Sequence, residues 1–334
     1  MATVQISDIY NPLVFAGDIQ ESQIELNRFI SSGVALRNPI IDGMATTGGN
    51  IGELPFFKPL GTDEPNYSND DASSTSSPKN ITSAKQVYRL AAQNQSWSVM
   101  DLAAELALQD PVAAITGRIG QYWATNNERR AIKSSLGVLA DSVANHSGDM
   151  VNDVHASTAA AITADTQISG DAVLDAFQTL GDHDSLVTAM AVHSVQYTAL
   201  RKQNLIDFIP NARGEVNIPT YMGKQLIVDD SLPVEAVGDT FKYTSILFGA
   251  GAFATGEGRV LNPSELDRDP SSGNGGGQEI IYSRRSDIIH PQGYQFTSAS
   301  VAGQSATQAE LADASNWTRA YERKNIPMAF LVTN

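Results

Sequence analysis

The chain contains no cysteine, which excludes disulfide bridges, thiolate metal sites and a cysteine nucleophile. It has no apolar run long enough to cross a bilayer, and its first residues, MATVQISDIYNP, lack the basic-then-apolar order of a signal peptide. It also has no basic cluster: 22 lysines and arginines stand against 37 aspartates and glutamates, a net charge of −15. Nucleic-acid binding draws its affinity from cations that neutralise phosphates, so this chain is not expected to bind DNA tightly or to bind a membrane.

Familiar catalytic and cofactor motifs are missing as well. The five histidines have no HxxxH or HExxH spacing, and there is no GxSxG, P-loop or zinc pattern. The run from Gly249 to Ala254 mimics a dinucleotide fingerprint, but more glycines follow it in place of a phosphate-binding helix, which favours close strand packing. Asp229 and Asp230 are interpreted as a solvated turn, and His183 as part of a turn cluster. We therefore expect no enzyme activity, catalytic residue, cofactor or metal.

The composition is that of a folded protein. With 334 residues, of which 42% are hydrophobic and 18% charged, the chain can form two or three compact units. Its longest helical period runs from Pro111 to Val143, with Asp110 as N-cap and proline at the first helical position. At about 1.5 Å per residue this helix would be roughly 50 Å long. We also expect a shorter helix before it, capped by Ser98 and ending at Leu108.

The long helix has one apolar stripe and one polar face. It contains Gly117, Gly120 and Gly137, each of which costs about 1 kcal/mol relative to alanine, so we expect it to pack closely on a sheet formed by strands within 317–332. The polar face is equally consistent with a solvated surface and with an inter-subunit surface. Its charged residues are Arg118, Glu128, Arg129, Arg130 and Lys133.

The part of the chain before the helix has few apolar residues of its own. Residues 1–40 are interpreted as an arm, because such a segment cannot make a private core. Within residues 41–96, an apolar run at 51–60, a polar stretch at 63–79 and a strand at 80–95 predict a projecting two-stranded ribbon. A lone ribbon is marginally stable in water, so we expect it to lie on something else. The alternative is an ordinary long surface loop.

The part after the helix alternates between helical and strand patterns, which predicts a compact α/β unit. The expected elements are a helix over 171–180 capped by Ser169, a buried strand over 186–192, a helix over 195–203 capped by Ser194, strands over 216–221, 224–228 and 241–253, a loop over 257–278, a strand over 280–289, and one or two strands within 317–332.

Three local runs, together with this order of segments, resemble the major capsid proteins of tailed bacteriophages. The runs are LGDHDSLVTAMAVHSVQYTALRKQNLIDFIP at 180–210, PTYMGKQLIVDDSLP at 219–233, and the closing pair HPQGYQF at 290–296 and NWTRAYERKNIPMAFLVTN at 316–334. The resemblance implies an α+β fold of the Johnson (HK-ninety-seven-like) type. The implied layout is an N-terminal arm at 1–40, an E-loop at 41–96, a P-domain at 97–165 and 286–334 with its spine helix at 111–143, and an A-domain at 166–285.

The resemblance also implies a function. A subunit of this family assembles with itself into hexamers and pentamers that form an icosahedral head around double-stranded DNA, without sequence-specific contacts. It would be found in the virion and assemble in the bacterial host cytoplasm, with a scaffolding protein and a portal and, in some relatives, a decoration protein. The chain starts at the arm without a long helical pro-segment, which suggests either a separate scaffold or a sequence that is already the mature form. The alternative is an encapsulin-type shell of a bacterial compartment, with a cofactor-binding α/β enzyme a distant third.

Candidate inter-subunit residues come from the helix and from the ribbon. The ribbon contributes Lys58, Lys79 and Lys85, and the helix contributes Arg118, Glu128, Arg129 and Arg130. Some relatives cross-link an E-loop lysine to an asparagine of a neighbour. Because no partner asparagine or activating glutamate is identifiable here, we make no prediction of a cross-link.

Overall fold

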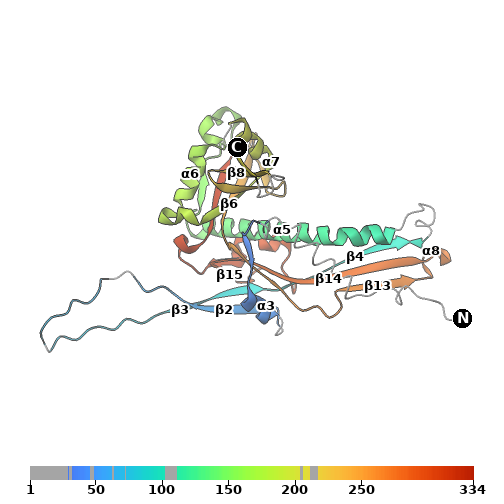
Figure 1. The fold of residues 1–334 in the computed structure, drawn as a ribbon, viewed down its shortest axis with the longest axis horizontal. Helices are drawn as coiled ribbons and strands as arrows, with labels where there is room; N and C mark the ends of the chain where they lie inside the picture. Colours follow the sequence, from blue (N-terminus) through green and yellow to red (C-terminus); the bar gives the residue numbers. More distant parts are fainter. Residues whose placement is uncertain are drawn as a thin grey trace.

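The computed structural model describes Phe29 and residues 32–45, 49–61, 64–71, 73–101, 111–203, 206–210 and 217–334. One long helix, a five-stranded sheet and an eight-stranded sheet make up its body, and a thin ribbon projects from it (Figure 1). The expected α+β class is confirmed. Among the described helices, none is long and apolar enough to span a membrane. Most of the arm, the expected helix ending at Leu108 and the expected cap Asp110 lie outside the described residues.

The long helix is α5, Pro111–Asn145, so the predicted start is confirmed and the end lies two residues later than predicted. Its first half lies over the five-stranded sheet (Figure 1). The predicted cap Ser98 is wrong, because this serine lies in strand β4, Ala91–Met100. Ten consecutive residues of β4 pair with strand β14, Gln278–Pro291, and this pairing outweighs a local capping signal.

The five-stranded sheet is built on β14. On one side β14 pairs with β4, and on the other with β13, Ser264–Asp269, and β12, Phe253–Glu257, which in turn pairs with β1, Ala35–Arg37. The prediction of a loop over 257–278 is therefore wrong. The sequence SELDRD offers a single apolar residue, Leu266, because only one face of this strand is covered.

A cluster of large side chains fixes the first half of α5 to this sheet. Ile119 and Trp123 of the helix are each 1% exposed and pack on Ile281 of β14, with Trp97 of β4 beside them. The indole Nε1 of Trp123 donates a hydrogen bond of 2.9 Å to the hydroxyl of Ser283. The helix therefore has a buried anchor with both its apolar surface and its polar atom satisfied.

The eight-stranded sheet carries the α/β unit. Its order is β5-β17-β11-β6-β9-β8-β7, with β10 paired to β11. The bounds are β5 Val151–Asp153, β6 Val187–Val192, β7 Asp207–Pro210, β8 Asn217–Tyr221, β9 Lys224–Val228, β10 Val234–Val237, β11 Thr240–Gly249 and β17 Met328–Thr333. The predicted buried strand is β6, which confirms the apolar run. The strand predicted over 241–253 ends earlier, at Gly249, where the chain turns into β12 of the other sheet.

Helices α6, Gly170–Gln178, and α7, Ser194–Lys202, complete this unit. The Ser169 side chain accepts a bond from the N–H of Ala172, which confirms it as the cap of α6. For α7 the prediction is off by one residue, because the His193 ring accepts the bond from the N–H of Val195. Further elements are α3 Pro39–Ala45, α8 Ser272–Gly275, α9 Gln308–Leu311, β15 Tyr294–Phe296 and β16 Trp317–Arg319, with β2 Ile51–Phe57 and β3 Ser83–Arg89 forming the ribbon.

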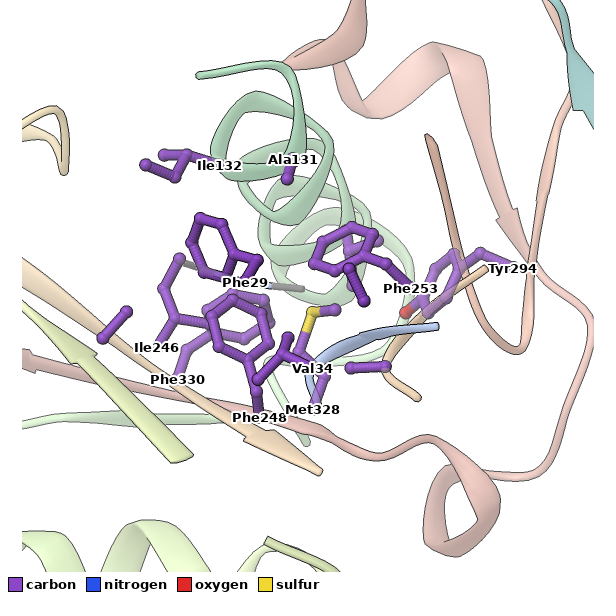
Figure 2. Packing of buried hydrophobic residues seen from close by; sticks show 14 of the residues in the cluster. Phe29, Val34, Ala131, Ile132, Ile246, Phe248, Phe253, Tyr294, Met328 and Phe330 are labelled. Atoms are coloured by element: carbon purple, nitrogen blue, oxygen red, sulfur yellow. The ribbon is translucent and has the colours of Figure 1, made fainter. Parts of the chain in front are cut away.

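A second core lies under the later half of α5. Phe29 of the arm, Phe248 of β11, Phe330 of β17 and Ile132 of α5 converge there (Figure 2), with the rings of Phe29 and Phe248 edge to face at 5.6 Å. The expectation that strands within 317–332 underlie the helix is correct for this half alone. Under the first half the sheet is β14 with β4.

The glycines of α5 also have different surroundings. A Cβ on Gly137 would lie 2.2 Å from both the Leu311 carbonyl oxygen and Trp317 Nε1, so close packing is confirmed there. A Cβ on Gly117 would meet no atom within 4 Å, so packing does not explain that glycine.

An ion pair ties the turn that follows α5 to β16. The guanidinium of Arg319 donates bonds of 2.7 and 2.6 Å to the two carboxylate oxygens of Asp149. These hydrogen bonds hold the pKa of Asp149 below its ordinary value of 3.8. The folded state therefore favours the ionised carboxylate more than the unfolded state does.

This pair predicts a specific acid sensitivity. A depressed carboxyl pKa contributes stability above about pH 4, and that contribution is lost as the pH falls through the folded-state pKa. We expect Arg319→Gln to unfold at lower urea concentration than wild type at pH 7, and the gap between their midpoints to narrow near pH 3. Lys324→Gln, which removes an exposed pair with Asp182, is the control and should change the midpoint little. A gap that is constant with pH would contradict this account.

Candidate functional site

The ribbon is the part of the molecule most clearly built for contact with another molecule. Strands β2, Ile51–Phe57, and β3, Ser83–Arg89, pair antiparallel and project away from the body (Figure 1). The predicted projecting ribbon is thus confirmed. Several of its large apolar side chains are exposed, among them Phe57 at 71% and Leu60 at 76%. Exposed apolar residues gathered on a thin projection are typical of an interaction surface.

The ribbon is firmly rooted at its base. Tyr88 of β3 is buried among Ile41 and Ile288 and lies directly over Gly52 of β2, where any Cβ would collide with its ring. The ring of His290 lies 6.4 Å away, and burial lowers the pKa of this histidine to about 4, so it is neutral at neutral pH. The root therefore behaves as part of the hydrophobic body and holds the ribbon in a set direction.

Polar contacts reinforce this root. Arg89 donates bonds of 2.7 and 3.0 Å to the carbonyls of Gly303 and Gln304, and the N–H of Ala92 donates to the Ser305 hydroxyl at 2.9 Å. The same loop receives a bond from Arg130 of α5 at the Ala306 carbonyl, 3.0 Å. Sequence reasoning missed this clamp, because an arginine that bonds to backbone carbonyls has no sequence signature of its own.

The lysines predicted as contacts have different environments. Lys58 and Lys79 are exposed on the ribbon. Lys85 instead forms an ion pair of 2.6 Å with Glu53 on the opposite strand. It therefore already stabilises the ribbon from within its own chain.

The predicted polar face of α5 is in fact divided. Glu128 is 5% exposed, and Arg130 is directed to the Ala306 carbonyl with its pKa lowered by burial, so both point into the subunit. Arg118 and Arg129 are exposed and Lys133 is half-buried. At 100° per residue, these last three fall within about 60° of one another around the helix. We call them the α5 flank.

The other sequence candidates are structural. The Asp229 carboxylate accepts a bond from Ser231 N–H at 2.8 Å, and that of Asp230 accepts one from Ser194 N–H at the start of α7, 3.2 Å. The His183 ring lies 3.1 Å from the Lys324 carbonyl. After Gly249 the chain enters strand β12, and a Cβ at this glycine would lie 2.6 Å from Pro327, so close packing is the reason for it. Within the described ranges, no three His, Asp or Glu residues are grouped as a metal site would need.

Comparison with known proteins identifies the family. The sequence model of the family described as "Major capsid protein 13-like" matches residues 8–326 of this chain. The major capsid protein of Bacillus phage SPP1 is 34% identical over 330 residues, covering 98% of this chain and 97% of that one.

Solved capsids share the fold at low sequence identity. The capsid of Ralstonia phage GP4 matches with a TM-score of 0.58 at 10% identity, covering 90% of this chain and 87% of that one. The cyanophage Pam1 capsid matches with a TM-score of 0.51 at 9% identity, covering 87% and 86%. The chain therefore belongs to the major capsid protein 13-like family of phage capsid proteins and has the Johnson (HK-ninety-seven-like) fold that its sequence resembles.

Proposed function

We propose that this protein builds the head of a tailed phage, assembling with itself into hexamers and pentamers that close into an icosahedral shell around double-stranded DNA. The ribbon is the observation that carries this proposal. Toward the tip, Tyr67 donates a bond to Glu64 and Asn66 donates one to the Ser77 carbonyl within the ribbon itself, while Phe57, Leu60 and Tyr67 remain exposed. A second copy of the chain supplies the surface that would bury them.

The proposed layout of the subunit follows the family, with one change. The arm, the E-loop, the P-domain on spine helix α5 and the A-domain keep their expected places. Residues 253–285 were assigned to the A-domain, but their strands β12, β13 and β14 pair with β4 and β1. We therefore move them to the P-domain, where they join α5 and the last residues of β4.

The proposed role is structural rather than enzymatic, in a virion assembled in the host cytoplasm. The net charge of −15 suits a container wall, because such a wall holds together through protein contacts and does not trap the DNA it encloses. A scaffolding protein and a portal are the proposed assembly partners, with a decoration protein as an addition. The relatives are phage capsid proteins, which favours DNA over the docked enzyme of an encapsulin as cargo.

Inter-subunit contacts are proposed for charged residues at the surface of the subunit. On the ribbon these are Lys58 and Lys79, and on α5 they are Arg118 and Arg129 with Lys133. Lys85, Glu128 and Arg130 contribute indirectly, through the shape of the ribbon and the position of the helix.

Deleting Asp63 to Lys79 tests the proposal. We expect the deleted protein to fold, with circular dichroism and thermal unfolding close to wild type, because the tip extends away from the body (Figure 1). Closed particles counted by negative-stain microscopy should become rare. A variant with these residues replaced by an equal number of glycines and serines separates the effect of length from that of the side chains. Wild-type yields of closed particles from the deletion would refute the bridging role of the ribbon.

A further inference from the structure

The turn that joins strands β13 and β14 carries an exposed asparagine. Three successive residues of this turn, Gly273, Asn274 and Gly275, have left-handed backbone, with φ values of 64°, 57° and 88°. Asn274 is exposed, and a Cβ built on Gly275 would meet no atom within 4 Å. In the whole sequence, Asn274 is the only asparagine that precedes a glycine. The turn therefore presents the chain's single asparagine–glycine pair to solvent.

This turn is held more firmly at its start than at Asn274. The Asp269 carboxylate accepts bonds of 2.9 and 2.6 Å from the N–H and the hydroxyl of Ser271, and one of 2.8 Å from the Ser272 hydroxyl. Further on, the Gly275 N–H donates a long bond of 3.4 Å to the Ser271 carbonyl. Ordinary N–H···O bonds measure about 2.7 to 3.2 Å, so this one is weak. Opening of the turn around Asn274 therefore costs little free energy.

We propose that Asn274 is a site of spontaneous deamidation. In the opened turn, the main-chain nitrogen of Gly275 attacks Cγ of the Asn274 amide, and the new C–N bond closes a cyclic imide. The side-chain nitrogen leaves as ammonia and takes the proton that the Gly275 nitrogen loses. Water then adds to either carbonyl of the ring and breaks one C–N bond, which gives aspartate or isoaspartate. Glycine favours the attack because it has no Cβ to obstruct its nitrogen.

The closed turn keeps the two reacting groups apart. The ψ of Asn274 is 43°, which places the Gly275 nitrogen on the opposite side of the Cα–C bond from the Asn274 side chain. The attack therefore requires rotation about ψ. Glycines on both sides of Asn274 allow that rotation with little steric hindrance. The reaction should consequently proceed almost as fast as in an unfolded peptide.

The chain also has one aspartate–glycine pair, and there the fold blocks the corresponding cyclisation, which would release water. Asp42 and Gly43 lie within helix α3. The two oxygens of the Asp42 carboxylate accept bonds of 2.7 Å from Arg37 Nε and 2.9 Å from the Glu257 N–H. Both the main chain and the side chain are thus held away from the geometry that the ring needs. Of the two pairs, the structure exposes only the one at Asn274.

The modification adds one negative charge to each copy that undergoes it. Arg268, the cation of the same hairpin, is already paired with Asp101 at 2.6 Å and with Glu279 at 3.7 Å. The new carboxylate therefore adds to an acidic end of the hairpin, and the isoaspartyl form also lengthens the main chain of the turn. The reaction needs the folded subunit alone. It therefore goes beyond the proposed function and does not depend on assembly.

Peptide mapping of the full-length protein tests this proposal. The protein is kept at mildly alkaline pH, denatured and digested with trypsin, and the fragment between Arg268 and Arg284 is followed by liquid chromatography and mass spectrometry. This fragment should gain the mass of an amide-to-acid conversion and split into an aspartyl and an isoaspartyl peak. The rate should lie within about threefold of that of a synthetic peptide of the same residues, because an exposed turn opens at almost no cost. Asn50, which is also exposed but precedes Ile51, should stay unconverted.

Three variants separate the chemical step from the conformation. Gly275→Ala should slow the conversion by about tenfold or more, because its methyl group obstructs the attacking nitrogen. Alanine at a φ of 88° strains the turn toward opening, so a slower rate can only come from the chemical step. Gly276→Ala changes a residue of ordinary φ, −71°, and should leave the rate unchanged. Asp42→Asn creates a second asparagine–glycine pair inside α3 and should remain unconverted while Asn274 reacts.

Two results would overturn the proposal. The first is a fragment that stays intact, or that converts more than about tenfold more slowly than the peptide, because the turn would then be closed to the reaction. The second is conversion of the asparagine introduced by Asp42→Asn as fast as that of Asn274. The sequence alone, and not the fold, would then select the site.

Discussion

Trp123→Ala is expected to lower the free energy of unfolding by about 3 to 5 kcal/mol, the usual cost of truncating a fully buried tryptophan. The indole is 1% exposed and fills the space between α5 and β14. Its removal leaves a cavity against Ile119 and Ile281, and it deprives the buried Ser283 hydroxyl of its donor. The measurement is urea unfolding followed by circular dichroism.

The neighbouring Tyr122 is the matched control for this prediction. It is an aromatic residue on the same turn, but it is 41% exposed and packs edge to face on Trp97 at 5.4 Å. Tyr122→Ala should therefore cost clearly less than Trp123→Ala. Equal losses at the two positions would show that the first half of α5 is not anchored through Trp123.

Replacing two glycines of α5 by alanine should change the free energy of unfolding in opposite directions. Gly137→Ala places a methyl group on the Leu311 carbonyl and the Trp317 indole, which are themselves joined by a hydrogen bond of 2.7 Å. Overpacking of this kind costs about 1 to 3 kcal/mol. Gly117→Ala places its methyl group in open space and should gain up to about 1 kcal/mol from helix propensity.

Thermal unfolding of both variants beside wild type gives the comparison directly. The melting temperature should fall for Gly137→Ala and rise for Gly117→Ala. A rise for both would mean that the later half of α5 can move away from Trp317 at little cost. The close approach at Gly137 would then be incidental to the fold.

Strong local periodicity accounts for what the sequence could predict of the fold. The bounds of α5, the buried strand β6 and the cap of α6 at Ser169 each depend on a signal within a few residues. Strand β13 could not be predicted, because its sequence, SELDRD, has one inward apolar residue and its pairing partner lies on β14. Ser98 was misread for a related reason: its strand is specified by ten pairings across the sheet.

The candidate surface was predictable in outline but not residue by residue. A projecting ribbon follows from a polar tip between strands that have no core of their own. Which charged residues of α5 are buried and which are exposed does not follow from the sequence. The helix packs first on one core and then on another, and the side of the helix that is buried changes between them. In the later half of α5 a wider part of the helix surface is covered. Glu128 is therefore buried and Arg130 half-buried, while Arg129 between them stays exposed. A pattern with one apolar stripe cannot show this change.

The long pairing of β14 with β4 has a mechanical consequence. Ten residues of β4, from Ala91 to Met100, are matched in unbroken register with β14. A tensile load applied along these strands acts on all of these hydrogen bonds at once, in shear. A load applied across them would open the bonds one after another, as in a zip. Strands β4 and β14 run alongside α5 (Figure 1), so the subunit resists stretching best along the axis of this helix.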